Sequence, residues 1–260
     1  MPPDSDWSRG TRPVEVVTAD GVHLRGIVVA SRTPGAHSPT FVVAHGFTNS
    51  TARPDFRRLA AWLSRYGEVR GLDFRGHGRS GGASGAGGDP ELADVDAAVR
   101  AARADGATAV VTVGMSMGGG AALRQAALGD HRPDAVVSVS AVSRWYVRDT
   151  PPMRRVHWLL ETTPGRRLAS RAVRLRLGEP WLTPPPAPLE VVSRIAPIPL
   201  LMLHGDRDAY FPLEHFRLLV EAAGPTAAAE VVPGFGHAES GASAALVDRI
   251  GRWASATIDR

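Results

Sequence analysis

Short apolar runs alternate with amphipathic segments along most of the chain. The runs predicted as strands are Val14–Thr18, Val22–Ala30, Phe41–Ala44, Glu68–Asp73, Ala109–Val113, Ala135–Val139, Ile198–Leu203 and Ala229–Val232. Apolar residues recur at helical spacing in Asp55–Tyr66, Glu91–Ala104, Gly118–Leu128, Leu213–Ala223 and Ala242–Ala256. Strands that alternate with helices are joined by right-handed crossovers. The pattern therefore predicts an α/β fold with a mostly parallel, twisted sheet of about eight strands and helices on both faces.

The alternation is interrupted at two places. Asp20-Gly21 joins the first two strands and is typical of a β-hairpin. Residues 144–190 contain no clear strand and end in a proline-rich stretch. We therefore expect a core of residues 1–143 and 191–260, with residues 1–12 as an N-terminal tail. Residues 144–190, called the inserted segment below, are expected to form a small helical cap, because insertions after a sheet strand often lie over a ligand site.

Polar residues follow five of the predicted strands, and ligands of open parallel sheets bind at the carboxyl ends of the strands. These sequences are His45-Gly46-Phe47-Thr48, Asp73-Phe74-Arg75-Gly76-His77-Gly78, Gly114-Met115-Ser116-Met117-Gly118, His204-Gly205-Asp206-Arg207-Asp208 and Gly234-Phe235-Gly236-His237. A serine, acidic residues and histidines at one edge of a sheet are the groups that nucleophilic catalysis requires.

Two serines lie in a G-x-S-x-G pattern, Ser80 and Ser116. The pattern marks a nucleophile only where a strand precedes the serine and a helix follows directly, because this turn exposes the hydroxyl. Ser116 stands between a predicted strand and a predicted helix, whereas Ser80 lies in a glycine-rich loop with no helix behind it. We therefore predict that Ser116 is the nucleophile.

The serine needs a base, and the base needs a carboxylate that orients it. His237 follows the last predicted strand on a glycine-flanked loop, so we interpret it as the base, whereas histidines beside glycine in the other turns more often organise their loops. Asp206 and Asp208 both follow one strand. We favour Asp208 because it lies further beyond the strand end, and we give Asp73 a lower rank. The predicted catalytic residues are thus Ser116, Asp208 and His237.

Acyl transfer also requires donors for the oxyanion that develops on the carbonyl oxygen. The N–H of Met117, at the predicted helix start, is one candidate. The N–H of Phe47, in the turn after Phe41–Ala44, is the other. Each such donor typically stabilises the transition state by about 3 to 4 kcal/mol. We therefore predict a substrate-binding oxyanion hole formed by Phe47 and Met117.

These five motifs resemble the α/β-hydrolase superfamily, specifically its serine esterase and lipase-like branch. The resemblance extends over most of Val14 to Ala256 outside the inserted segment. It implies the α/β-hydrolase fold, a structural role for residues 73–80, and a cap that sets substrate choice. A serine at the nucleophile position argues against the haloalkane dehalogenase and epoxide hydrolase branches, which use a carboxylate there.

Composition adds a feature that the motifs do not explain. The 260 residues include 30 cationic side chains, all arginine, and no cysteine, so neither a disulfide nor a thiol nucleophile is available. Nine arginines lie between Arg144 and Arg176, beside only two acidic residues, and the rest of the chain is slightly acidic. They either face water on amphipathic helices or attract an anionic substrate. The small net charge of +4 and the lack of a recognisable binding module argue against nucleic acid as a partner.

The sequence as a whole predicts a serine hydrolase that cleaves a small-molecule ester or thioester through an acyl-enzyme, without a metal or cofactor. Thioester hydrolysis, C–C bond hydrolysis, acyl transfer and perhydrolysis on the same triad remain alternatives, as does a non-catalytic ligand receptor on this scaffold. No apolar run approaches the ~18 residues of a membrane helix, and residues 1–10 lack the apolar core of a secretory signal. We therefore expect a cytoplasmic protein without stable membrane insertion; the oligomeric state is not predicted.

Overall fold

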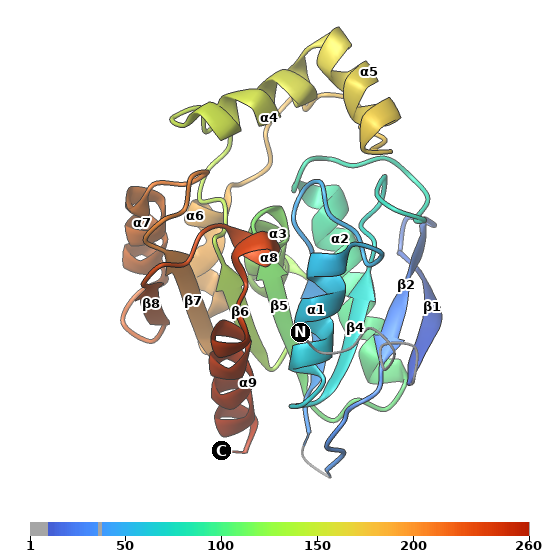
Figure 1. The fold of residues 1–260 in the computed structure, drawn as a ribbon, viewed down its shortest axis with the longest axis vertical. Coiled ribbons are helices and arrows are strands. Elements are labelled where there is room, and N and C mark those ends of the chain that lie inside the picture. The colour runs from blue at the N-terminus through green and yellow to red at the C-terminus, as the bar shows by residue number, and fades with distance from the viewer. Residues whose placement is uncertain (1–9, 36–37, 260) are drawn as a thin grey trace.

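A twisted, mostly parallel sheet runs through the middle of the molecule (Figure 1). The computed structural model describes residues 10–35 and 38–259, and within them the sheet has eight strands in the order β1-β2-β4-β3-β5-β6-β7-β8. The strands are β1 (Thr11–Val17), β2 (His23–Val29), β3 (Thr40–Ala44), β4 (Glu68–Leu72), β5 (Val110–Met115), β6 (Ala135–Val139), β7 (Leu200–Gly205) and β8 (Ala228–Val232). β1 and β2 pair antiparallel with each other and β2 with β4, whereas all other pairs are parallel. The predicted fold class is confirmed.

Helices cover both faces of the sheet, and the central strands β3, β5, β6 and β7 are buried along their whole length. The helices are α1 (Pro54–Leu63), α2 (Asp89–Ala104), α3 (Met117–Leu128), α4 (Pro151–Glu161), α5 (Thr163–Ala172), α6 (Pro188–Val191), the 3₁₀ helix η2 (Val192–Ile195), α7 (Leu213–Ala223), α8 (Ala238–Gly241) and α9 (Ala244–Ile258). Leucines of α1 and α9, including Leu59 and Leu246, pack on one face. The apolar sides of α2, α3 and α7 pack on the other. This sandwich holds the carboxyl ends of the parallel strands at one rigid edge.

The N-terminal boundary differs from the expectation. The antiparallel register of β1 continues to Thr11, which pairs with Val29, so Thr11 and Arg12 belong to the sheet and not to a tail. The first four residues of β1 are not buried, and apolar periodicity therefore could not mark its start. The remainder of the expected tail, residues 1–9, lies outside the described residues.

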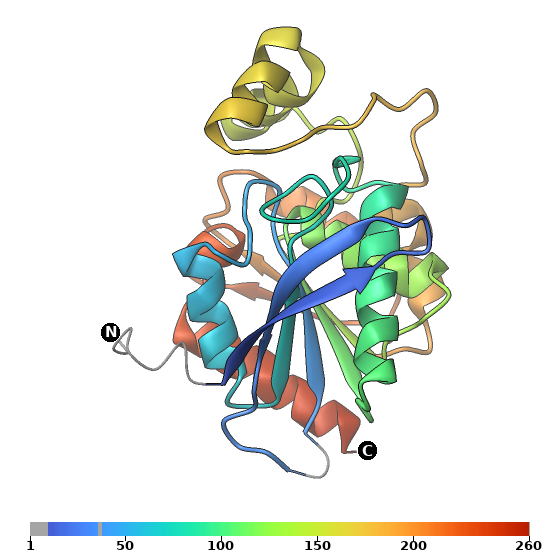
Figure 2. The ribbon, with the colours of Figure 1, turned by 90° about the vertical axis from the view of Figure 1, so that its right-hand side faces the viewer.

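The inserted segment leaves the sheet after β6 and carries α4 and α5 above the carboxyl edge of the strands (Figures 1 and 2). Thr150 and Thr162 cap the two helices by accepting hydrogen bonds from the backbone N–H groups of Met153 and Gly165. The chain returns through α6, which spans the expected boundary at residue 190. In the described part of the chain, no helix combines the length and apolar character that a membrane span needs.

Candidate active site

Ser116 lies at the sharp turn between β5 and α3. Its φ of 53° and ψ of −115° are a strained combination for a residue with a side chain. A Cβ on Gly114 would lie 2.3 Å from the Gly118 carbonyl oxygen, and a Cβ on Gly118 would lie 2.2 Å from that of Ala44. The two glycines of the motif are therefore required by the close approach of α3 to the strands. The Ser116 N–H donates a hydrogen bond of 2.9 Å to the carbonyl oxygen of Val139 on β6, and this bond holds the turn in place.

The three residues predicted to act together form one hydrogen-bonded chain. The Ser116 hydroxyl oxygen lies 2.8 Å from His237 Nε2, and His237 Nδ1 lies 2.8 Å from Asp208 Oδ2. Ser116 follows β5, Asp208 follows β7 and His237 follows β8, so the parallel strands bring together residues separated by up to 121 positions. The side chain of Asp208 is 1% exposed and that of His237 13%, so the carboxylate end of the chain is shielded from solvent.

Asp208 is a buried carboxylate held in its charged form. Burial raises its pKa, but hydrogen bonds from His237, Phe211 and Tyr210 and attraction to His237 outweigh that cost and hold the pKa below its usual value. The backbone N–H groups of Tyr210 and Phe211 both donate to Oδ1, at 2.8 and 3.1 Å. Oδ2 is thereby left for His237. The Tyr210 ring stacks on the His237 imidazole with 4.3 Å between ring centroids, which restricts rotation of the imidazole.

The loop that contains Phe47 passes directly beside Ser116. A Cβ on Gly46 would lie 3.6 Å from the Ser116 Cβ. His45 is fully buried, accepts a hydrogen bond from the Phe74 N–H at Nε2 and donates from Nδ1 to the Gly46 carbonyl at 2.7 Å. Since a trans peptide points its N–H opposite its carbonyl, this bond sets the direction of the Phe47 N–H. Neither this N–H nor that of Met117 has an acceptor among the described residues.

The residues ranked lower hold the loops around the site. Ser80 is 2% exposed, donates to the Asp73 carbonyl and accepts from the Arg25 N–H. The Asp73 carboxylate accepts from the backbone N–H groups of Thr51 and Arg79. His204 Nε2 donates to the Phe211 carbonyl at 2.9 Å. Neither Ser80 nor Asp73 takes part in the chain that contains Ser116.

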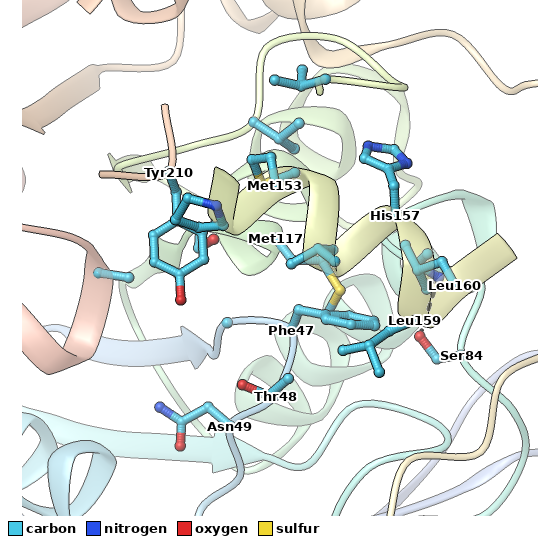
Figure 3. Close-up of a pocket in the computed structure, with 18 of the residues that line it drawn as sticks. Phe47, Thr48, Asn49, Ser84, Met117, Met153, His157, Leu159, Leu160 and Tyr210 are labelled. Atoms are coloured by element: carbon cyan, nitrogen blue, oxygen red, sulfur yellow. Dashed lines mark hydrogen bonds between the residues drawn. The ribbon is translucent and has the colours of Figure 1, made fainter. Parts of the chain in front are cut away.

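A cavity of about 990 Å³ opens above the Ser116–His237 pair. Its walls are mainly apolar, and Figure 3 shows Phe47, Met117, Met153, Leu159 and Leu160 turned toward the same space. Met153, Leu159 and Leu160 lie on α4, so the inserted segment forms one wall while the sheet edge carries the reactive groups. A largely apolar cavity with a few polar groups at one side is typical of sites that bind small molecules.

Most arginines of the inserted segment point away from this cavity. All nine except Arg166 are exposed. Arg148 pairs with Glu161 at 2.7 Å, and Arg166 donates to the carbonyl oxygens of Leu160, Leu177 and Gly178. Arg144, Arg155 and Arg166 are the members of the nine that also line the cavity. This arrangement favours the interpretation that the arginines face water.

Two polar groups near the site were missed by sequence reasoning. Glu239, two residues after His237, is 3% exposed and accepts a hydrogen bond from the Gly46 N–H. His215 lies between Ser143 and Asp149, at 2.7 and 3.0 Å. Ser143 has no solvent exposure, so this second serine–histidine–aspartate chain connects the inserted segment to α7 and to the loop after β6 and does not present a nucleophile. The one sequence signal that could have indicated a role for Glu239 is its position two residues after His237.

A metal centre is not indicated: in residues 10–35 and 38–259, no three His, Cys, Asp or Glu side chains are grouped to hold an ion.

Comparison with protein-family models gives a match over residues 35–187, to the family described as serine aminopeptidase, S33. Esterase LipC of Mycobacterium tuberculosis is 32% identical over 112 residues, which are 42% of this chain and 26% of that protein. The match thus extends over about a quarter of the relative's length.

Solved structures share the fold at low sequence identity. The Pyrococcus furiosus esterase Pf2001 superposes with a TM-score of 0.71 at 21% identity, over 99% of this chain and 95% of that one. The α/β-hydrolase GrgF from Penicillium sp. sh18 gives 0.72 at 19% identity, over 96% and 99%. These likenesses establish the fold.

Proposed function

Because the chain belongs to the serine aminopeptidase S33 family of α/β-hydrolases, we propose that it is a serine hydrolase that cleaves carboxylic esters through an acyl-enzyme on Ser116. The observation that carries the proposal is the hydrogen-bonded chain Ser116–His237–Asp208, whose serine end opens into a largely apolar cavity. The esterase names of LipC and Pf2001 agree with this substrate class.

The reaction follows from the positions of these groups. His237 Nε2 takes the hydroxyl proton of Ser116, and the serine oxygen attacks the ester carbonyl. The N–H groups of Phe47 and Met117 stabilise the resulting oxyanion. His237 then protonates the leaving alcohol, and the acyl group stays on Ser116. A water molecule, deprotonated by His237, attacks the acyl-enzyme; the bond to Ser116 breaks, His237 returns the proton to the serine oxygen, and the acid is released. Asp208 stabilises the imidazolium in both halves of the cycle.

The class assignment is tested with a fluorophosphonate probe, which reacts with an activated serine. We expect stoichiometric labelling, with the adduct located on Ser116 by peptide mass spectrometry. Labelling of the Ser116→Ala variant should be absent. An unreactive Ser116 in the folded protein would overturn the proposal. Rates on a series of esters and thioesters of increasing acyl length then separate ester from thioester hydrolysis. The labelled protein serves as the inactive control.

We further propose that the inserted segment acts as a cap whose apolar wall selects the acyl group, while its arginines serve solubility. Salt between about 20 and about 300 mM NaCl screens exposed charges. If the arginines do not select the substrate, this screening should change the turnover of a neutral ester and of an ester with a remote carboxylate by the same factor. Initial rates at subsaturating substrate provide the measurement. A markedly steeper salt dependence for the anionic ester would show that the arginines attract substrate.

A further inference from the structure

The loop carrying the Phe47 N–H is anchored by a side chain from the opposite side of the active site. Glu239 Oε1 accepts a hydrogen bond from the Gly46 N–H at 2.7 Å, although the two residues are 193 positions apart. We propose that Glu239 is a positioning residue that holds the oxyanion-hole loop in register with His237 through this bond. The inference rests on the proposed function, since it assigns Glu239 a part in the same acyl transfer.

The environment of Glu239 is that of a built contact. The residue is 3% exposed, and a Cβ on Gly46 would lie 3.1 Å from its Oε2. A side chain at residue 46 would therefore crowd the carboxyl group, and glycine allows the close approach of the loop. Burying a carboxyl group without a polar partner is costly, and the Gly46 N–H supplies one. Glu239 thus contributes to the geometry of the loop and not merely to the volume of the core.

Three successive peptide groups of the loop are held by side chains. Glu239 holds the peptide between His45 and Gly46, and the His45 ring holds the next one through the Gly46 carbonyl. His77 Nε2 lies at hydrogen-bond distance from the Phe47 carbonyl, which holds the third. His45 and His77 belong to the same side of the site as the loop. Glu239 alone of these three comes from the loop that carries the base.

This connection fixes two parts of the reaction relative to each other. Glu239 begins α8 together with Ala238, directly after His237. A shift of the Gly46–Phe47 loop would move the oxyanion donor away from the carbonyl attacked by Ser116, whereas the Ser116–His237 bond could persist. Misplacement of a reacting group by about 1 Å can cost 100-fold in rate. The expected consequence of losing Glu239 is therefore weaker transition-state stabilisation with little change in substrate binding.

The hydrogen bond requires an acceptor oxygen and not a negative charge. Burial raises the pKa of Glu239 to about 7, with a further contribution from Asp55 on α1, against the opposing effects of the Gly46 N–H and the Asn49 amide. The side chain is thus partly protonated at neutral pH, and Oε1 can accept from Gly46 in either state. Glutamine keeps this acceptor at nearly the same volume, whereas methionine keeps the volume and removes it.

The test compares Glu239→Gln, Glu239→Met and Glu239→Ala with the wild type on a p-nitrophenyl ester. We expect the Met and Ala variants to lose about 10- to 100-fold in kcat with KM changed less than about threefold, since losing an oxyanion donor outright costs about 100- to 1,000-fold. Glu239→Gln should stay within about threefold of the wild type. The affinity of a trifluoromethyl ketone, which forms a hemiketal oxyanion on the serine, should fall in parallel with kcat.

Asp134→Ala is the matched control, because the Asp134 carboxylate accepts from the Val110 N–H at 2.6 Å at the opposite end of β5. It should lower thermal stability without changing kcat. Full kcat in a folded Glu239→Met variant, or a loss confined to KM, would overturn the inference. A tenfold loss of kcat in Glu239→Gln would also overturn it, because that result would show that the negative charge is required. This variant keeps the inference falsifiable even where the Met and Ala variants do not fold. A wild type that neither hydrolyses esters nor reacts with the fluorophosphonate would instead refute the proposed function.

Discussion

Replacing Ser116 with alanine is expected to lower kcat for a p-nitrophenyl ester by about a million-fold, to a residual rate set by the oxyanion hole and binding. The substitution removes the oxygen that lies 2.8 Å from His237 Nε2 and leaves no other hydroxyl in the chain with Asp208. Residue 116 already has a Cβ and a positive φ in the wild type, so alanine can adopt the same backbone conformation in the turn. Stopped-flow and long-time assays measure kcat, and circular dichroism verifies the fold.

Ser80→Ala is the matched control, because Ser80 occupies the other G-x-S-x-G sequence. Its hydroxyl connects the Asp73 carbonyl with the Arg25 N–H in a buried position. Leaving these partners unsatisfied should cost about 1 to 3 kcal/mol of unfolding free energy while kcat stays near the wild-type value. A variant of Ser116 that retains more than a percent of the activity would show that another group is the nucleophile.

The sequence was sufficient for the parts of the site that depend on strand ends. Ser116, Asp208 and His237 each lie in the turn or loop that follows a predicted strand, and parallel strands bring their carboxyl ends to one edge. The choice between Ser80 and Ser116 needed only the helix that begins at Met117. Local pattern and global topology therefore point to the same residues, and the structure places these three side chains in contact.

Other features depend on contacts that no local pattern encodes. Glu239 reaches Gly46 across 193 positions, and its burial follows from how the two loops pack and not from its neighbours in sequence. His215, a polar position on the amphipathic helix α7, is buried by Ser143 and the inserted segment. The start of β1 was missed because exposed residues such as Thr11 pair through backbone hydrogen bonds alone. In each case tertiary contact, not propensity, decides the environment.

The loop after β7 performs three structural tasks around His237. Tyr210 and Phe211 donate their N–H groups to Asp208, and the ring of Tyr210 stacks on His237. Thr150, the N-cap of α4, donates its hydroxyl hydrogen to the Tyr210 carbonyl at 2.8 Å. The same short segment thus orients the Asp208 carboxylate, restrains the His237 imidazole and anchors the helix that lines the cavity. Thr150 and Tyr210 thus connect α4 to His237, beside the apolar contact between Met153 of α4 and Phe211.

Replacing Asp208 with asparagine is expected to lower kcat by about 10,000-fold with little loss of stability. The amide oxygen must occupy the Oδ1 position, because the N–H groups of Tyr210 and Phe211 both point at it. The amide NH₂ then faces His237 Nδ1, which can only accept, so the imidazole proton moves to Nε2. In that tautomer Nε2 cannot take the proton of Ser116. Asp206→Asn, whose exposed carboxylate accepts from the Gly234 N–H, should leave kcat unchanged. Steady-state kinetics of both variants decide the assignment, since equal losses would show that the aspartates serve the loop rather than the base.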